Sequence, residues 1–336
     1  MQIYNQAERL STHSETESPV RAAGSASHRA VFMGTPGFVV PVLDALQDCP
    51  EVEVAAIYTP PDRRRGRGQA YEASPVKQRG QELGIPVVQP RTFRDTDVVA
   101  QLESYRPDVI VVAAYGRLLP PEVLAIPPFG CLNLHPSLLP RHRGPAPVAG
   151  AILAGENITG VSLMLLDEGM DTGPVIAQRE RLIREFDDAG TLTEKLFVDG
   201  AALLVDTLPG WTAGSVSAVK QNDELATYTA KLERADGLAD WTSSAETLSR
   251  RQRAYVPWPR LYTNWQGKEI KLLDVAPVPG AATEPGLVTN AGSEEIVIGT
   301  GEGLLVVRRL QMEGRRATGA QEFLRGYPDF KGARLG

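Results

Sequence analysis

The segment CLNLHPSLLPRHRGPAP, residues 131–147, carries the first side chains whose types and spacing could do chemistry. It begins like a β-strand, and four prolines restrict the backbone that follows. Asn133 and His135 are two positions apart, so on a strand their side chains point to the same face. An amide and an imidazole at one place can hold a carbonyl oxygen as it gains charge and can move the protons of an attacking amine. A histidine alone is more often structural, and the neighbouring amide is what favours a catalytic pair.

A carboxylate for this pair is available in LDEGMDTG, residues 166–173. Counted from Asp167, an EF-hand calcium loop would need glycine at Thr172 and glutamate at Gln178, so the pattern fails and we expect no metal. A solvated acidic turn remains an alternative. The functional hypothesis is that one carboxylate of this loop approaches the histidine and raises its proton affinity. Because the sequence has no Ser or Cys in a nucleophile elbow, it favours direct transfer between two bound substrates over a covalent acyl-enzyme.

Strands and helices that alternate along the first two thirds of the chain must position these residues. Apolar runs predict the strands, and helical spacing of apolar residues predicts the helices. The predicted strands cover 29–34, 52–59, 86–89, 108–116, 130–135 and two segments within 159–183, and the predicted helices cover 38–47, 74–84, 95–104, 146–154 and 190–208. Continuous apolar strands separated by helices indicate an α/β fold in which helices cover both faces of a mostly parallel sheet. Ligands bind such sheets beyond the carboxyl ends of the strands, where residues 136–147 fall.

The last third of the chain has a different pattern. Residues 209–234 are small and polar, which is typical of a linker. Ser243 and Glu246 resemble a capping box that opens a helix to about Tyr255, and the short β-rich pieces beyond it predict a small antiparallel barrel. We divide the 336 residues into an extension predicted to be disordered (1–28), a catalytic domain (29–212), a linker (213–232) and a barrel domain (233–336).

The composition excludes several classes of protein. The chain is 42% hydrophobic and 23% charged, without an apolar run near the roughly 18 residues of a membrane span, so we expect no membrane association. Cys49 and Cys131 form no C-x-x-C motif, so we expect neither a disulfide framework nor a zinc site, and a reduced, cytoplasmic compartment. GTPG at 34–37 lacks the G-x-G-x-x-G spacing of a nicotinamide or flavin site, and GTGEG at 299–303 predicts a hairpin turn.

Arginines gather in PDRRRGRG, residues 61–68, although the net charge of −6 does not suggest a nucleic-acid-binding protein. Most charge runs are solvated, mobile loops. This one lies between a strand and a helix at the ligand-binding edge of the predicted sheet, where arginines can grip phosphates with paired hydrogen bonds. The segment therefore indicates a phosphate-bearing partner.

The two segments at the predicted site carry a resemblance. NLHPSLLPRHRGPAP with LDEGMDTG resembles the folate-dependent formyltransferases, and MGTPGF, YTPPDRRRGRGQAYEASPVK and VVAAYGRLLP extend the resemblance from about residue 29 to the end of the chain. Together these motifs narrow it to the members whose acceptor is a tRNA. The resemblance implies a Rossmann-like catalytic domain followed by an OB-like barrel that holds tRNA, and we expect a monomer.

By position, the resemblance assigns Asn133 to polarising the formyl carbonyl, His135 to general acid–base catalysis and Asp171 to the carboxylate partner of that histidine. The implied folate contacts are Ser137, Leu138, Leu139 and Pro140, and the implied tRNA contacts are Arg63, Arg64, Arg65, Arg67 and Lys231. His142 stands where the family usually has an aromatic residue, and Pro145 where it usually has a small one. These two departures change the details of the pocket and remove no catalytic group.

The implied reaction transfers the formyl group of a co-substrate, 10-formyltetrahydrofolate, to the α-amine of methionine on initiator tRNA, for translation initiation and without a permanently bound cofactor. We hypothesise that Asn133 and protonated His135 hold the developing oxyanion. Two other functions compete: formyl transfer to a small amine such as a nucleotide or sugar-nucleotide, and RNA binding without catalysis. The arginine segment and the barrel favour a tRNA acceptor, because a small acceptor needs neither.

Overall fold

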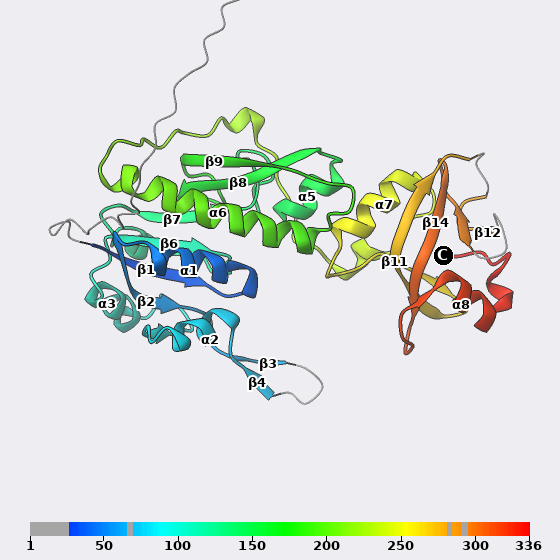
Figure 1. Cartoon of the computed structure of the whole chain (residues 1–336), viewed down its shortest axis with the longest axis horizontal. Helices are drawn as coiled ribbons and strands as arrows, with labels where there is room; N and C mark the ends of the chain where they lie inside the picture. Colours follow the sequence, from blue (N-terminus) through cyan, green and yellow to red (C-terminus); the bar gives the residue numbers. More distant parts are fainter. Residues whose placement is uncertain (1–26, 66–69, 281–283, 290–294) are drawn as a thin grey trace, which may run out of the picture.

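A seven-stranded sheet forms the centre of the N-terminal half of the computed structural model, which describes residues 27–65, 70–280, 284–289 and 295–336 (Figure 1). The strands lie in the order β5-β2-β1-β6-β7-β8-β9. The first five strands in this order are parallel, and β8 and β9 are each antiparallel to the strand before it. Their bounds are β1 (His28–Gly34), β2 (Val52–Tyr58), β5 (Val87–Val88), β6 (Val109–Ala113), β7 (Cys131–His135), β8 (Ile158–Leu165) and β9 (Val175–Leu182). The predicted mostly parallel sheet is confirmed. The predicted extension 1–28 lies outside the described residues except for its last two, and His28 opens β1.

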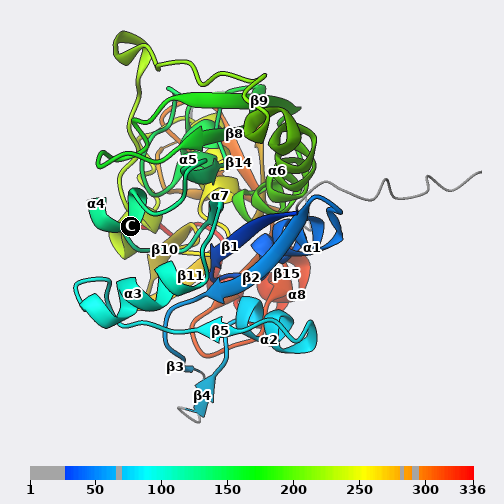
Figure 2. The same cartoon turned by 90° about the vertical axis from the view of Figure 1, so that its left-hand side faces the viewer.

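Helices cover both faces of this sheet (Figure 2). On one face, α1 (Val40–Asp48) and α6 (Ala189–Thr212) pack over a core that includes Leu132 and Leu134 of β7. On the other face, α3 (Thr96–Ser104) and α4 (Pro121–Leu124) pack over a second core that includes Cys131. The remaining elements of this half are η1 (Gly37–Val39), α2 (Pro75–Glu82), α5 (Pro147–Leu153) and a hairpin of β3 (Arg63–Arg65) with β4 (Ala70–Glu72). Because strand residues alternate between faces, Asn133 and His135 are directed to the side of α3 and α4.

A curled antiparallel sheet of six strands forms the C-terminal half. Its order is β10-β11-β14-β13-β12, and β15 pairs with β14. The bounds are β10 (Tyr262–Trp265), β11 (Lys268–Val278), β12 (Val288–Thr289), β13 (Ile296–Gly299), β14 (Leu304–Met312) and β15 (Thr318–Gly319). Helices α7 (Ala245–Ala254) and α8 (Ala320–Gly326) pack with this sheet around one apolar core. The predicted barrel is present as this curled sheet, and GTGEG is the turn between β13 and β14, as predicted.

Two local predictions need correction. The N-cap of α7 is Ser244, whose side chain accepts from the N–H of Thr247 at 3.1 Å, so the predicted capping box beginning at Ser243 is wrong by one residue. Helix α6 runs past Pro209 to Thr212. A proline removes one helical N–H, but this loss falls in the last turn, and Ala213 still donates to the oxygen of Pro209 at 3.0 Å.

The two halves meet where α5 packs against the end of α7, in a cluster that joins Val148, Ile152 and Leu196 to Ala254 and Tyr255. The segment after α6 includes η2 (Asp223–Leu225) and has the composition of a linker, but it packs on the catalytic half through bridges from Val219 to Val175 and from Tyr228 to Arg143. It is followed by η3 (Arg234–Gly237), where Arg234 pairs with Glu269 of the C-terminal half. None of the helices in the described ranges is long and apolar enough to cross a membrane.

Candidate active site

The last residues of β7 place an amide and an imidazole at the carboxyl end of the parallel strands. Strand β7 lies between β6 and β8, where Asn133 pairs with Val112 and Met164. The Asn133 side chain is half-buried, and its amide makes no hydrogen bond within the part of the chain that the structure describes. Both of its N–H groups are therefore available to a ligand.

The imidazole of His135 is held at both nitrogens and is only 5% exposed. Its Nε2 lies 3.0 Å from the backbone oxygen of His142, and because a carbonyl can only accept, Nε2 carries the proton. In the neutral ring, Nδ1 then has the free lone pair. Nδ1 faces the carboxylate of Asp171, 3.6 Å from Oδ1. Burial lowers the pKa of His135, against the raising effect of the Asp171 charge and of the bond to His142, so the neutral ring is favoured.

The carboxylate of Asp171 lies on the loop between β8 and β9, which is closed by its own hydrogen bonds. Asp167 accepts from the N–H of Gly169 (3.0 Å) and from the hydroxyl of Thr172 (2.8 Å), which closes the loop on itself. A Cβ at Gly173 would lie 1.9 Å from the backbone oxygen of Leu165, so only glycine fits there. Asp171 itself has a φ of 55°, which non-glycine residues rarely adopt. The sequence hypothesis that a carboxylate of this loop approaches His135 is therefore met by Asp171.

The SLLP segment after β7 is fixed by polar side chains of the neighbouring strands. The hydroxyl of Ser162 on β8 donates to the oxygen of Ser137 (2.6 Å) and accepts from the N–H of Leu139 (3.0 Å). Gln178 on β9 donates to the oxygen of Leu139 (3.0 Å) and to the Ser162 hydroxyl (2.8 Å). The side chains of Ser137 and Leu139 are buried, whereas Leu138 and Pro140 are partly exposed. We call this segment, Ser137 to Pro140, the SLLP ledge. A ligand bound on it would therefore contact backbone atoms and the side chains of Leu138 and Pro140.

The segment from Pro140 to Ala146 is covered by residues 227–229 of the linker. The Arg143 N–H donates to the oxygen of Thr227 (2.9 Å), and the Thr229 N–H donates to the oxygen of Arg143 (2.8 Å). Gly144 follows, and its N–H donates to Oδ2 of Asp171 (2.8 Å). The linker thus forms part of the wall around the site.

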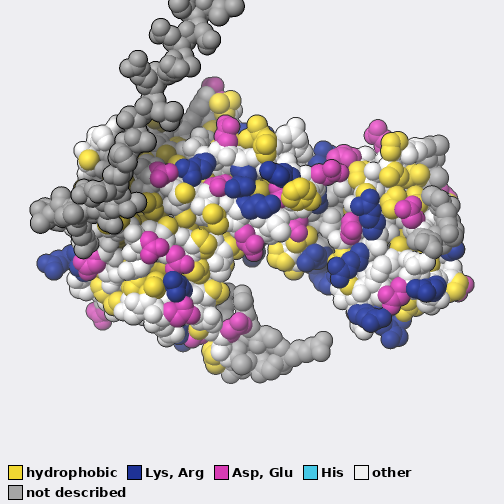
Figure 3. Space-filling model, viewed as in Figure 1, with side chains coloured by type: hydrophobic (Ala, Val, Ile, Leu, Met, Phe, Trp, Pro, Cys, Tyr) yellow, Lys and Arg dark blue, Asp and Glu magenta, His cyan; other side chains and the backbone are white. Residues whose placement is uncertain are grey.

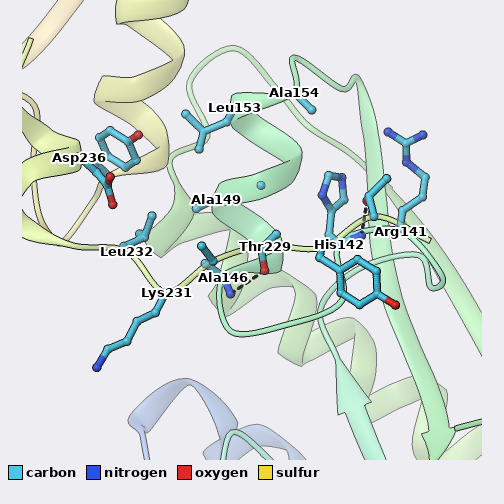
Figure 4. A pocket seen from close by; sticks show the side chains of 15 residues that line it. Arg141, His142, Ala146, Ala149, Leu153, Ala154, Thr229, Lys231, Leu232 and Asp236 are labelled. Carbon is cyan, nitrogen blue, oxygen red and sulfur yellow. Dashed lines mark hydrogen bonds between the residues drawn. The ribbon is translucent and has the colours of Figure 1, made fainter. Parts of the chain in front are cut away.

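His142 is a buried residue with a carboxylate partner. Its Nε2 lies 2.8 Å from Oε1 of Glu156, which also receives the Arg141 guanidinium. Next to it, between α5 and the linker, is a cavity of about 460 Å³ whose lining includes Arg141, His142 and Lys231 (Figure 4). Figure 4 shows the Lys231 side chain extending away from Ala146. The cavity lining does not include Asn133, His135 or Asp171, so it lies beside the candidate catalytic group rather than over it.

Cys131, two residues before Asn133, is the nearest thiol along the strand. Burial raises its pKa to about 12, and its Sγ donates to the oxygen of Val123 at 3.8 Å. A thiol in this state is not a nucleophile at neutral pH. This agrees with direct transfer between two substrates.

The arginine segment forms the β3–β4 hairpin, which projects from the catalytic half (Figure 1). The base of the hairpin is anchored by Asp62, which accepts from Nζ of Lys77 (2.6 Å) and from Nε2 of Gln89 (2.8 Å). These hydrogen bonds, that of Lys77 first, hold the pKa of Asp62 below its usual range, so the anchor is ionised at neutral pH. The backbone of Arg63, Arg64 and Arg65 lies in β3, and Arg67 lies outside the described residues. Elsewhere, Lys and Arg side chains lie near the junction of the two halves and along the lower edge of the C-terminal half (Figure 3).

Two family models match the two halves of the chain. The model described as "Formyl transferase" matches residues 28–208, and the model described as "Formyl transferase, C-terminal domain" matches residues 231–328. The methionyl-tRNA formyltransferase of Roseiflexus sp. (strain RS-1) is 44% identical over 310 residues, which cover 92% of this chain and 95% of the relative. That of Pelotomaculum thermopropionicum is also 44% identical over 310 residues, covering 92% of this chain and 98% of the relative. The chain belongs to the methionyl-tRNA formyltransferase family.

Solved structures share the fold of this formyltransferase at low sequence identity. The N-formyltransferase from Helicobacter canadensis, in complex with folinic acid and dTDP-3-aminofucose, aligns with a TM-score of 0.62 at 16% identity, covering 84% of this chain and 98% of that one. HypX from Aquifex aeolicus, in complex with tetrahydrofolic acid, aligns with a TM-score of 0.57 at 20% identity, covering 89% of this chain and 47% of that one. The fold is therefore shared with these more distant proteins, one of which was solved with a sugar nucleotide bound.

The formyltransferase site contains residues that the sequence did not identify. Arg143 and Gln221 are both buried, and Gln221 contacts the backbone of the 166–174 loop. Ser162 and Gln178 hold the ledge. A single Gln or Ser has no local pattern that marks it, and only its distant partners reveal it. The one signal available in the sequence was the position of Arg143 in PRHRGP, where it lies among prolines next to the predicted pair.

Proposed function

We propose that this formyltransferase moves the formyl group of 10-formyltetrahydrofolate to the α-amine of methionine on initiator tRNA, and that Asn133, His135 and Asp171 carry the reaction. The observation that carries the proposal is their arrangement at the end of β7. It combines an amide that has no hydrogen-bond partner among the described residues, a buried imidazole whose Nδ1 has a free lone pair, and a carboxylate 3.6 Å from that nitrogen. Such a group can polarise an acyl carbonyl and accept a proton from an amine.

In the proposed reaction, the neutral amine attacks the formyl carbon, and the carbonyl electrons move onto oxygen as the new C–N bond forms. The amide N–H of Asn133 holds this oxyanion. Nδ1 of His135 accepts a proton from the amine, and Asp171 stabilises the imidazolium. The proton then passes to N10 of the folate as the bond between N10 and the formyl carbon breaks. The products are the formylated amine and tetrahydrofolate.

The pKa of His135 favours this proton-accepting role over the role we hypothesised from the sequence. A protonated ring could also hold the oxyanion, but burial lowers the pKa of His135 and makes the neutral form the resting one. The base is therefore ready before the amine arrives, and the imidazolium exists only while Asp171 and the oxyanion can balance its charge.

The folate would lie against the ledge formed by Ser137, Leu138, Leu139 and Pro140. With Ser137 and Leu139 turned inward, recognition would use backbone groups together with the apolar surface of Leu138 and Pro140. The bonds from Ser162 and Gln178 keep that backbone fixed, so little conformational entropy would be lost on binding.

For the tRNA, we infer contacts from the arginine segment of residues 61–68 (Arg63, Arg64, Arg65 and Arg67), from Lys231 and from the curled C-terminal sheet. Both the hairpin and the C-terminal half lie outside the reaction centre, and a small amine would need neither. We retain the division into a catalytic domain (29–212), a linker (213–232) and a tRNA-binding domain (233–336) as part of this proposal, acting as a monomer in the cytoplasm.

The deciding experiment follows formyl transfer from 10-formyltetrahydrofolate to charged initiator tRNA, with nucleotide and sugar-nucleotide amines as competing acceptors. Asn133→Ala should lower kcat by about 10²–10³, the usual cost of losing one oxyanion donor, with little change in thermal stability. Asn157→Ala is the control, because Asn157 is an exposed amide of the catalytic half, between α5 and β8, to which we assign no role. If kcat of Asn133→Ala stayed within a few-fold of wild type, Asn133 would not be an oxyanion donor. If the enzyme formylated a small amine in preference to charged tRNA, that amine would be the acceptor.

A further inference from the structure

Gln221 is a linker residue whose side chain is completely used inside the protein. It is only 7% exposed. Its Nε2 donates to the backbone oxygens of Asp171 (2.8 Å) and Gly173 (2.7 Å). Its Oε1 accepts from Nε (3.0 Å) and Nη2 (2.9 Å) of Arg143. An amide has two donors and two main acceptor positions, and all four are occupied.

Arg143 completes the connection to the linker. Its side chain is 1% exposed, and besides Gln221 it donates to the hydroxyl of Tyr228 (3.0 Å) and to Oδ1 of Asp223 (2.8 Å). Its guanidinium also lies 5.8 Å from the centre of the Tyr228 ring. Burying a guanidinium is costly unless it is paired, and here the linker supplies every side-chain partner.

Three consecutive residues therefore contact the candidate catalytic group or its support. The oxygen of His142 accepts from His135, the guanidinium of Arg143 holds Gln221, and the N–H of Gly144 donates to Asp171. The backbone of Asp171 has the rare φ of 55°. A residue in this conformation keeps it when its surroundings hold it, and the bond from Gln221 to the Asp171 oxygen is one of the contacts that do so.

We propose that Gln221 of the linker, held in place by Arg143, is a positioning residue that fixes Asp171 against His135, and that Arg143 acts through it, so that the linker sets the catalytic geometry. The inference rests on the role of Asp171 in the proposed function. In the absence of these two side chains the 166–174 loop would lose its contacts to the linker at residues 171 and 173. Asp171 would then spend less time near Nδ1 of His135.

The test begins with Gln221→Ala in the full-length enzyme. Displacing a catalytic group by about 1 Å commonly costs about 10²-fold, so kcat should fall by about 10–100-fold, with KM for the folate within about twofold of wild type. In an Asp171→Asn background the same substitution should cost less than about threefold, because residues that act through one another are not additive. Gln252→Ala is the control, since Gln252 also donates one bond to a backbone oxygen, that of Leu273 (2.8 Å), far along the chain from the site.

A second readout separates positioning from general destabilisation. The charge of Asp171 raises the proton affinity of His135, while the ring of His142 lowers it. When Asp171 is displaced, an NMR titration should show the pKa of His135 below its wild-type value, whereas a loss of folded protein would leave that pKa in place. Gln221→Glu keeps an acceptor for Arg143 but loses both donors, and it should be as impaired as Gln221→Ala.

Two results would overturn the inference in distinguishable ways. Equal losses of kcat from Gln221→Ala with and without Asp171→Asn, or full activity of Gln221→Glu, would mean that Gln221 does not act through Asp171, and the proposed function would stand. A nearly unchanged kcat for Asp171→Asn alone would remove the role of Asp171 itself. In that case both the inference and that part of the proposed function fail.

Discussion

Two loops meet at His135, and the molecule holds them by different means. The loop after β7 contacts Nε2 of the imidazole through the oxygen of His142, and its SLLP ledge is anchored by Ser162 and Gln178 on the next two strands. The loop between β8 and β9 brings Asp171 to Nδ1, and Gln221 of the linker holds its backbone. The proposed folate surface is thus fixed by the sheet itself, whereas the carboxylate is fixed by the segment that leads to the second domain.

This difference separates binding from catalysis in a way that substitutions can test. A ledge supported by strands should be rigid whether or not tRNA is present, because its anchors belong to the core sheet. A carboxylate supported by the linker depends on a segment to which we also assign a tRNA contact. Damage to the anchors of the SLLP ledge should therefore appear in KM for the folate, and damage to the linker contacts of the second loop in kcat.

The largest effect is expected at the point where the second loop touches the imidazole. Asp171→Asn keeps the shape of the side chain and removes its charge, so the imidazolium loses its counter-ion and kcat should fall by about 10²–10⁴-fold. The sign of the pKa change follows from the same contact. Burial already lowers the pKa of His135 from its ordinary 6.5, and Asp171 opposes that shift, so NMR should place the wild-type pKa below 6.5 and that of the variant lower still.

Asp199→Asn is the control for this substitution, since Asp199 is also a largely buried carboxylate, paired with Arg181 on β9. An unchanged pKa of His135 in Asp171→Asn would mean that the two groups are not electrostatically linked in solution. The proposed catalytic role of the loop between β8 and β9 would then be wrong.

An intermediate effect is expected at the anchor of the ledge. Ser162→Ala leaves the Leu139 N–H and the Ser137 oxygen without their partner, at a cost of about 1–3 kcal/mol for each buried group left unsatisfied. Small movements of the segment should recover part of this cost, so we expect the KM for the folate to rise by about tenfold. We expect kcat at saturating folate to stay within a few-fold of wild type. Steady-state kinetics with the folate varied and charged tRNA fixed would measure both.

Thr207→Val on α6 removes another buried hydroxyl, bonded to the oxygen of Leu203 at 2.6 Å, and should leave KM unchanged. If Ser162→Ala lowered kcat and left KM for the folate intact, the ledge would be part of the catalytic geometry. The two loops would then not differ as proposed.

The sequence predicted one side of this comparison better than the other. The candidate pair Asn133 and His135 could be found because strand periodicity places them on one face. The acidic glycine loop indicated only that one of its carboxylates approaches His135, and the resemblance to the folate-dependent formyltransferases singled out Asp171. Gln221 lies fifty residues from Asp171, and nothing in its neighbours distinguishes it from a solvated linker residue. Composition indicated a linker between two units, but it could not indicate that this segment packs beside the candidate active site, because that contact depends on partners distant in sequence.

The fold shows the same limit. Apolar periodicity predicted every strand of the large sheet, of which β1, β6 and β8 bury nearly continuous runs. It missed the β3–β4 hairpin, whose arginine-rich strands have no apolar alternation, and β10, which has only four residues. Both are edge elements stabilised by pairing with a neighbour rather than by burial of an apolar run.

The smallest effect is expected on the linker itself, at Lys231. This exposed residue borders the cavity beside α5, and we expect Lys231→Ala to raise KM for charged tRNA by about three- to tenfold and to reduce the salt slope of binding by about one. Lys220→Ala is the matched control, because Lys220 is exposed on the same linker and does not line that cavity. Equal effects of the two substitutions would assign the contribution to the overall charge of the linker rather than to Lys231. A fall in kcat together with the rise in KM, and with a lower pKa of His135, would mean that tRNA bound at Lys231 reaches Asp171 through Gln221. The Asp171 loop held by the linker would then respond to the acceptor, while the SLLP ledge held by the sheet would not.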